Sequence, residues 1–302
     1  MKLLKKKPVK IGLITCAVLF CMAVVFFKIE EIEDVIVKWK QEIFSISYAR
    51  IDVPECESFI DEGDEWFCNN RLIAHAGGGM QSIRYSNCKE AFENSVSDGY
   101  QIIETDLNLT SDAKIVLKHA WTGGAPTYEQ FMSMPIEYKY TPMDVEDLLD
   151  FMAENDSVFI VTDIKGANAG KIIERVVELA KEKHCEDVLN QFIIQIYCED
   201  DYDTFRTLYP FSNWIYTLYA SEKVDLGKVA KFCLTHDIRV VTIPYSWIQN
   251  DKYLSVFKKK NIKVFTHTVN DMETMKLLSK RGVYGFYTDD IKPRDLIDAG
   301  IE

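Results

Sequence analysis

The sequence lacks the signs of several classes of protein. Its 302 residues include only 14 glycines and 8 prolines, and 47% of them are hydrophobic, which excludes a disordered, collagen-like or low-complexity chain. A net charge of −12 is the opposite of the basic excess of nucleic-acid-binding proteins, so we expect no nucleic-acid partner. No pair of cysteines has the C-x-x-C spacing of a zinc site. Residues 71–302 contain no fixed-period repeat and no linker rich in Pro, Gly or Ser. The composition does not indicate an oligomeric state.

The first 28 residues differ from the rest of the chain in charge. They contain six lysines and no acid, which leaves −18 for the remaining 274 residues. Residues 11–27 are a run of 17 without a charge, at the short end of the range for a membrane-spanning helix. A signal peptide is the alternative, but the run ends in bulky Val and Phe residues and lacks a small-x-small cleavage pattern. We therefore predict an uncleaved membrane anchor.

This charge asymmetry also predicts the topology. Under the positive-inside rule the lysine-rich N-terminus lies in the cytoplasm. We therefore expect a single-pass protein of the cell membrane, with a tail and anchor at 1–28, a juxtamembrane stalk at 29–69 and an extracytoplasmic domain at 70–302. A glycosylation sequon begins at Asn108, where a glycan would obstruct the site identified below, so we expect a bacterial source.

From Arg71 onward, short β-branched runs alternate with longer amphipathic stretches. Strands are expected at Leu72–His75, Ile102–Asp106, Val158–Asp163, Phe192–Ile196, Trp214–Leu218, Arg239–Ile243, Lys263–His267 and Gly285–Thr288. Helices fit between them, for example at Asp144–Glu154, Ala169–Lys183, Lys223–His236, Asp271–Ser279 and Pro293–Ala299. Alternation at this spacing is typical of βαβ units, and eight such strands predict the α/β class and a closed (β/α)8 TIM barrel.

One additional run, Ile115–Lys118, follows the second strand too closely for a parallel crossover. It must therefore return antiparallel, as a β-hairpin added after strand two. If the turn is centred between Ser111 and Asp112, Glu104 lies opposite His119. The hairpin would then bring His119 over the mouth of the barrel.

Three acidic residues gather at the predicted strand ends, where TIM barrels place their chemistry. Glu104 and Asp106 are two positions apart in one strand, so their side chains point to the same face. Asp163 ends another strand. Each acid alone is more often a solvated residue, but three converging carboxylates are a site for a hard divalent cation, Mg²⁺ or Ca²⁺.

Other polar groups join these acids at the barrel mouth. His75 ends the first strand and His119 ends the hairpin, so the two could share proton transfers as acid and base. Lys165 is in phase with Asp163 and would supply a fixed positive charge. Gly77 belongs to a glycine run that lets the backbone approach an anion. Metal, lysine and two histidines together suit phosphoryl chemistry.

Several segments of the chain that include these residues resemble the glycerophosphodiester phosphodiesterase family. The resemblance rests on residues 71–78, 91–94, 103–112, 116–119, 163–165, 267–270 and 282–289. Family members are TIM barrels related to phosphatidylinositol-specific phospholipases C, and they cleave phosphodiesters with a divalent metal. In their usual mechanism a neighbouring substrate hydroxyl attacks phosphorus, and water then opens the cyclic ester.

The resemblance also implies roles for single residues. Glu104, Asp106 and Asp163 would hold the metal, and His75 and His119 would be the catalytic pair. Contacts to substrate or phosphate would come from Lys165, Gly77, Asn87 and His267.

The chain departs from the family pattern at several of these positions. Ala76 replaces an arginine, so a phosphate-binding guanidinium is lost unless Arg84 or Lys165 compensates. The other departures are Ser86 for a glutamate, Ala120 for an acid, Asp163 for the commoner glutamate and His267 for a tryptophan. Because the histidines and the three acids are present, these changes suggest an altered substrate more than lost activity.

Three functions remain open at this point. The first is a membrane-anchored phosphodiesterase acting on glycerophosphodiesters, lipid-derived head groups or surface polymers. The second is a phospholipase C-like lyase that stops at a cyclic phosphate. The third is a catalytically inactive barrel that serves as a surface binding module.

Overall fold

Eight parallel strands form a closed ring in the computed structural model of the chain, which describes residues 63, 65–68, 70–80, 83–219, 224–249 and 251–301. The strands are β1 (Leu72–Ala74), β2 (Ile102–Leu109), β4 (Phe159–Asp163), β5 (Phe192–Ile196), β6 (Asn213–Thr217), β7 (Val240–Pro244), β8 (Lys263–His267) and β9 (Gly285–Thr288). They are ordered β1-β9-β8-β7-β6-β5-β4-β2, and pairing between β1 and β2 closes the ring. The predicted eight-stranded parallel barrel is confirmed.

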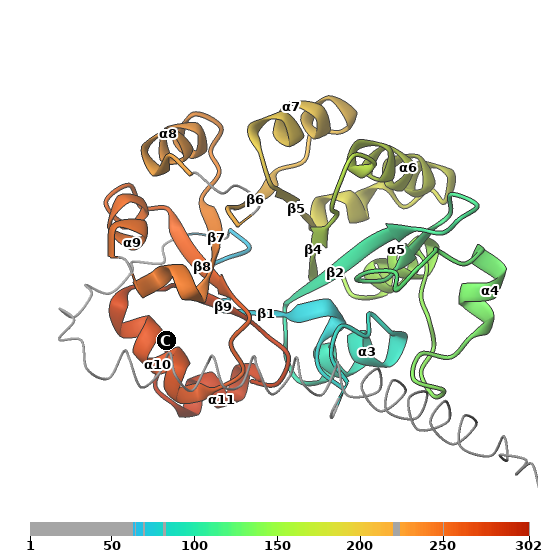
Figure 1. Cartoon of the computed structure of the whole chain (residues 1–302), viewed down its shortest axis with the longest axis horizontal. Coiled ribbons are helices and arrows are strands. Elements are labelled where there is room, and N and C mark those ends of the chain that lie inside the picture. The colour runs from blue at the N-terminus through green and yellow to red at the C-terminus, as the bar shows by residue number, and fades with distance from the viewer. Residues whose placement is uncertain are drawn as a thin grey trace, which may run out of the picture. The chain divides into compact units, whose positions relative to one another are not determined.

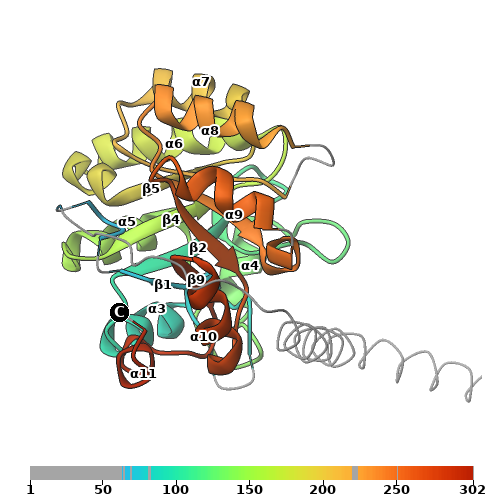
Figure 2. The same ribbon diagram turned by 90° about the vertical axis from the view of Figure 1, so that its left-hand side faces the viewer.

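Helices surround the strands (Figure 1). They are α3 (Lys89–Ser97), α4 (Tyr128–Ser133), α5 (Val145–Glu154), α6 (Ala169–Glu182), α7 (Glu199–Leu208), α8 (Leu226–Thr235), α9 (Asp251–Lys258), α10 (Met272–Arg281) and α11 (Pro293–Asp298). Short 3-10 helices are η1 (His75–Gly77), η2 (Glu186–Gln191) and η3 (Tyr245–Gln249). Figures 1 and 2 both place α6, α7 and α8 on one side of the strands and α3, α10 and α11 on the opposite side.

Local sequence accounts for these elements. Every residue of β5 (Phe-Ile-Ile-Gln-Ile) is buried, as expected for a parallel strand covered on both faces. Helix α6 buries one apolar stripe, and its lysines and glutamates lie on the other side. Helix α8 begins at Asp225, whose carboxylate accepts hydrogen bonds from two backbone N–H groups of the first turn. Helix α10 ends at Gly282, whose left-handed backbone suits glycine.

The extra hairpin is present, but its register differs from the prediction by one residue. Strand β3 (Ile115–Leu117) pairs antiparallel with the end of β2, with Leu107 opposite Leu117. In this register Thr105, rather than Glu104, would lie opposite His119. The cause is a five-residue turn centred on Asp112, in which Ala113 takes a left-handed φ of 60°.

The segment before β1 fills the end of the barrel at which the strands begin. Trp66 and Phe67 are buried in one cluster with Ile73 and Phe265. The Tyr284 hydroxyl donates a hydrogen bond of 2.8 Å to the Phe67 carbonyl. This packing closes one end of the barrel with mostly apolar side chains, and the acidic cluster lies at the opposite end.

The predicted localisation needs correction. In the part of the chain that the structure describes, no helix has both the length and the apolar character that a membrane crossing requires. The longest described helix, α6, has 14 residues and is amphipathic, whereas a span needs about 20 apolar residues. The expected anchor at 11–27 lies outside the described residues. On this finding, a single-pass protein of the cell membrane with a cytoplasmic N-terminus is not supported, and that localisation is withdrawn.

The close packing of β9 against β8 gives a first prediction. A Cβ atom at Gly285 would lie 2.2 Å from Cε1 of buried Phe265. We expect Gly285→Ala to lower the free energy of unfolding by about 1–3 kcal/mol, measured by urea denaturation. Gly124→Ala is the matched control, because no atom lies within 4 Å of its added Cβ. Equal stabilities of the two variants would contradict this account of the packing.

Candidate active site

Three carboxylates converge where the parallel pairing of β2 with β4 ends. Glu104 and Asp106 point to one face of β2, and the strand register sets Asp106 beside Asp163 of β4. Glu104 is 2% exposed and Asp106 is 3% exposed. One oxygen from each of the three carboxylates lies within 4.8 Å of the others. The structure therefore brings together the three acids that the sequence singled out.

Such a cluster needs a compensating positive charge. Burial is the larger cause and the negative charge of neighbouring Asp106 the next, and together they raise the pKa of Glu104 well above its usual range. Burial and then the negative charge of Asp163 are likewise the two largest causes that raise the pKa of Asp106. Lys165 offsets part of this repulsion, with its Nζ 2.6 Å from Asp163 and 3.6 Å from Asp106. Two buried carboxylates and the half-buried Asp163, which repel one another, are also the oxygen donors that Mg²⁺ and Ca²⁺ prefer, so these residues fit a hard divalent cation.

Asp163 is held in place through both of its oxygens. The Tyr197 hydroxyl donates a hydrogen bond to Oδ1, and Lys165 donates to Oδ2. Gln195 in turn donates to the Tyr197 hydroxyl at 2.8 Å. These partners restrict the orientation of the carboxylate, as the outer shell of a metal site does. No feature of the sequence pointed to Tyr197.

His75 is paired with an acid that received no role in the sequence interpretation. Its Nδ1 lies 2.9 Å from Oδ1 of Asp289, which directly follows β9. The Asn270 side chain donates a hydrogen bond of 2.7 Å to the other oxygen of Asp289. Burial opposes the charged imidazole, but Asp289 and then Glu104 outweigh it and raise the pKa of His75 to about 9. The position of Asp289 just after a strand was the signal that could have identified it.

His119 has the opposite electrostatic environment. Burial lowers the pKa of its imidazole, and the nearby Asp106 offsets this only in part. At neutral pH the metal-free protein therefore carries one protonated and one neutral histidine beside the acids. Groups whose pKa values are driven apart in this way suit the roles of acid and base.

Tyr85 lies between the two histidines. Its ring centroid is 4.9 Å from that of His75 and 4.6 Å from that of His119. The residue has a left-handed φ of 56°, and burial raises the pKa of its hydroxyl to about 12. The sequence gave no hint of this contact, because it joins residues from three separate segments.

The remaining predicted contact residues lie in different surroundings. The Asn87 amide donates a hydrogen bond of 2.9 Å to Asp106, so it supports an acid of the cluster. The Gly77 carbonyl accepts a hydrogen bond from Ser95, and a Cβ at Gly77 would press on the Phe92 ring. His267 lines a cavity of about 340 Å³, and burial lowers the pKa of its imidazole to about 4.

Ala76 contributes only its backbone to the site. The backbone N–H of Ala76 donates a hydrogen bond of 2.7 Å to Glu104. Arg84 lies within 3.5 Å of Asp289 and 3.1 Å of Asp290, so its charge is already balanced by two acids. Lys165 is also paired with two acids, Asp106 and Asp163, but it borders the 340 Å³ cavity and Arg84 does not, so it is the better placed of the two candidate replacements for the missing guanidinium.

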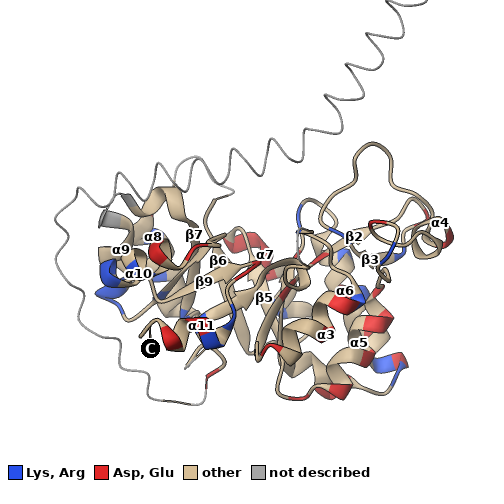
Figure 3. Cartoon of the chain, turned by 90° about the horizontal axis from the view of Figure 1, so that it is seen from below, with Lys and Arg blue, Asp and Glu red and all other residues tan. Residues whose placement is uncertain are grey.

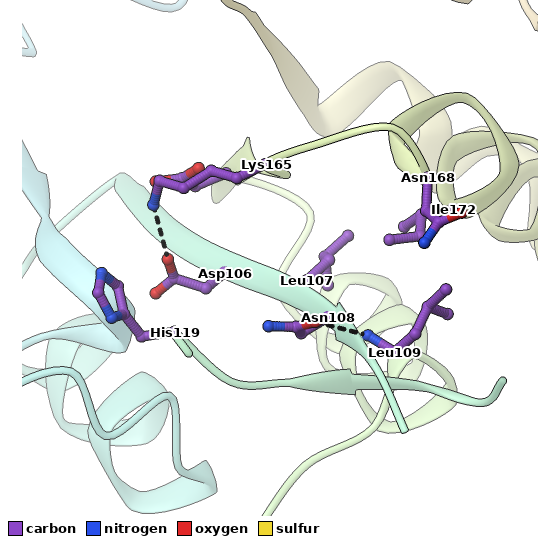
Figure 4. Close-up of a pocket in the computed structure, with 9 residues that line it drawn as sticks. Asp106, Leu107, Asn108, Leu109, His119, Lys165, Asn168 and Ile172 are labelled. Atoms are coloured by element: carbon purple, nitrogen blue, oxygen red, sulfur yellow. Dashed lines mark hydrogen bonds and ion pairs between the residues drawn. The ribbon is translucent and has the colours of Figure 1, made fainter. Parts of the chain in front are cut away.

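Two cavities meet at this site. The larger, of about 340 Å³, is bordered by His75, Glu104, His119 and Lys165 among others. The smaller, of about 70 Å³, lies beside Asp106 (Figure 4), where Lys165 reaches toward that carboxylate. A pocket of the larger size accommodates a small organic molecule.

Most acidic residues of the chain lie elsewhere. Helix α5 carries four acids and no base, whereas α10 carries three basic residues and one acid (Figure 3). These charges lie on the outer helices. The carboxylates of the site are therefore a separate group, set apart by their burial.

Comparisons with known proteins bear on the family and the fold. Residues 75–292 match the model of the glycerophosphoryl diester phosphodiesterase family. A glycerophosphodiester phosphodiesterase from Parabacteroides distasonis is similar in structure, with a TM-score of 0.62, 17% identity, and coverage of 77% of this chain and 97% of that one. A phosphodiesterase from Oleispira antarctica, solved with the product sn-glycerol-3-phosphate, has a TM-score of 0.60 and 15% identity, with the same coverage. The enzyme from Thermotoga maritima has a TM-score of 0.56 and 20% identity, covering 76% and 97%.

The pairing of His75 with Asp289 gives a second prediction. In metal-free protein with EDTA, we expect the His75 imidazole to titrate at about pH 9. Asp289→Asn should move this midpoint downward, because it removes the negative charge that favours the protonated ring while burial remains. Nitrogen-15 NMR of the imidazoles measures both midpoints, and a His75→Gln sample assigns the signal. A midpoint unaffected by Asp289→Asn would show that another group sets the pKa of His75.

Proposed function

Because the chain belongs to the glycerophosphoryl diester phosphodiesterase family, a family of phosphoric diester hydrolases, we propose that it hydrolyses glycerophosphodiester-type substrates with a divalent metal and two acid–base histidines. The observation that carries this proposal is the convergence of two buried carboxylates and the half-buried Asp163 with two histidines whose pKa values are shifted in opposite directions. The glycerol phosphate bound to the Oleispira antarctica enzyme supports a glycerophosphodiester as the substrate class.

Glu104, Asp106 and Asp163 would hold the metal, Mg²⁺ or Ca²⁺. When bound, the cation would neutralise these acids and polarise a phosphoryl oxygen. Lys165 would contact the phosphate from the side of Asp163, because its ammonium group borders both cavities. Tyr197 and Asn87 would keep two of the carboxylates in position.

The histidines would divide the proton transfers. In the first step a substrate hydroxyl would attack phosphorus and lose its proton to neutral His119. The bond from phosphorus to the leaving alcohol would break, and protonated His75 would supply the proton that this alcohol takes. In the second step water would open the cyclic ester, with the two histidines exchanging roles. Asp289 would stabilise the charged form of His75 throughout.

A third prediction tests hydrolysis and its dependence on the metal. Purified protein should convert glycerophosphoethanolamine to glycerol phosphate, followed with a coupled glycerol-phosphate dehydrogenase. EDTA should abolish turnover, and Mg²⁺ or Ca²⁺ should restore it. Glu104→Gln and His75→Ala should each lower kcat by about 100-fold or more, because each removes a group of the proposed chemistry.

Surface variants of the same residue types provide the controls. Glu154→Gln and His184→Asn change exposed residues and should retain activity within about twofold. If the folded protein hydrolyses no diester with any divalent cation, the catalytic proposal is wrong. That result would favour the inactive binding barrel.

A fourth prediction separates hydrolase from lyase. Phosphorus-31 NMR of the reaction should show a phosphomonoester as the final product, because the same two histidines can serve both steps. A cyclic phosphate that accumulates in proportion to the substrate consumed would instead identify the phospholipase C-like lyase.

A further inference from the structure

Thr217 carries a buried polar group that the proposed mechanism does not use. It is the last residue of β6 and is 1% exposed. Its hydroxyl has no hydrogen-bond partner among the described residues, yet the residue lines the larger cavity. Leaving a buried hydroxyl unpaired is unfavourable, and such groups in native proteins usually indicate a missing water, ion or ligand.

Three uncharged aromatic rings, those of Tyr219, His267 and Tyr287, line the same cavity as Thr217. His267 lies 5.3 Å from Tyr219 and 5.9 Å from Tyr287, measured between ring centroids, and both contacts are edge-to-face. Burial lowers the pKa of His267 to about 4, so its ring is neutral at pH 7. A ligand meets aromatic faces here together with single hydroxyl groups.

Hydrogen bonds hold these rings in one arrangement. The Tyr287 hydroxyl donates to Gln195 at 3.3 Å, and Gln195 donates to Tyr197 at 2.8 Å. The Tyr219 hydroxyl lies 3.3 Å from that of Tyr197. Ordering the rings before the ligand arrives reduces the entropy cost of binding.

A phosphodiester carries two alcohol groups, termed its arms, and this surface favours some arms over others. The carboxylates that border the cavity, Glu104 and Asp163, belong to the proposed metal site. A quaternary ammonium arm could pack on the aromatic rings, but it would leave the Thr217 hydroxyl unpaired. An acyl chain would bury the Thr217 hydroxyl without a partner. A hydroxylated ring can pack its C–H face on the aromatic side chains and hydrogen-bond to Thr217.

We propose that the wall formed by Thr217, Tyr219, His267 and Tyr287 is a subsite for a cyclic polyol, a hexose or a cyclitol, carried on one arm of the diester. This inference rests on the proposed function, since the subsite adjoins the proposed metal and histidine site. It narrows the substrate class from glycerophosphodiesters in general to those with a hydroxylated ring.

The test compares substrates that differ only in one arm. We expect kcat/KM to be at least tenfold higher for glycerophosphoinositol or glycerophosphoglucose than for glycerophosphoethanolamine. The first two substrates distinguish a cyclitol from a hexose. Thr217→Val keeps the shape of the side chain and removes its hydroxyl, so it should reduce this preference about five- to tenfold.

Thr266→Val is the matched control. Thr266 is also a buried strand threonine, but its hydroxyl donates to the Ile243 carbonyl and does not line the cavity. This variant should keep the wild-type preference. Equal kcat/KM values for ring and linear substrates in the wild type, or an unchanged preference in Thr217→Val, would overturn the subsite.

A binding measurement separates failure of the subsite from failure of the proposed function. Saturation-transfer NMR with Mg²⁺ compares myo-inositol 1-phosphate and glucose 1-phosphate with phosphoethanolamine. If the protein cleaves no diester but binds a ring phosphate through a Thr217-dependent contact, the subsite stands and the proposed function fails. If the protein cleaves diesters but shows no preference for a ring, only the subsite fails.

Discussion

Repulsion among three converging carboxylates, two of them buried, is the constraint on which the site depends. Glu104, Asp106 and Asp163 are brought within 4.8 Å by the parallel pairing of β2 with β4. Each acid has at least one donor that offsets the repulsion. The backbone of Ala76 serves Glu104, an asparagine amide serves Asp106, and Lys165 with a tyrosine hydroxyl serves Asp163. These donors do not remove the negative potential, and a divalent cation would complete the compensation.

Closure of the barrel creates the second feature of the site. Ala74 of β1 pairs with Thr288 of β9, and the next residues along these strands are His75 and Asp289. The two are 214 positions apart in the chain and 2.9 Å apart in space. The contact with Asp289, which favours the protonated imidazole, therefore forms only when the first and last strands meet. At the other end of the barrel, Trp66 fills the interior with apolar surface.

Much of the fold was predictable because each strand carries its own signal. The bounds of β5, β8 and β9 agree with those read from their apolar runs, and alternation with amphipathic helices predicted the parallel barrel. The hairpin was also predictable, since the connection is too short for a crossover. Its register was not, because that depends on the left-handed backbone of Ala113 in the turn. A charge pattern in residues 1–28 indicated a membrane anchor, and the described helices did not support the localisation drawn from it.

The sequence by itself determined the acidic half of the site. Residues two apart in a strand share a face, so Glu104 and Asp106 had to point together wherever the strand lay. Only the tertiary structure decided which distant residues meet them. Tyr85 and Thr217 carry no local signal of their roles, and the strand-end position of Asp289 does not identify its partner, because these contacts depend on strand order and barrel closure. Periodicity acts within one segment of chain, whereas hydrogen bonds, ring contacts and pKa values depend on neighbours that the fold supplies.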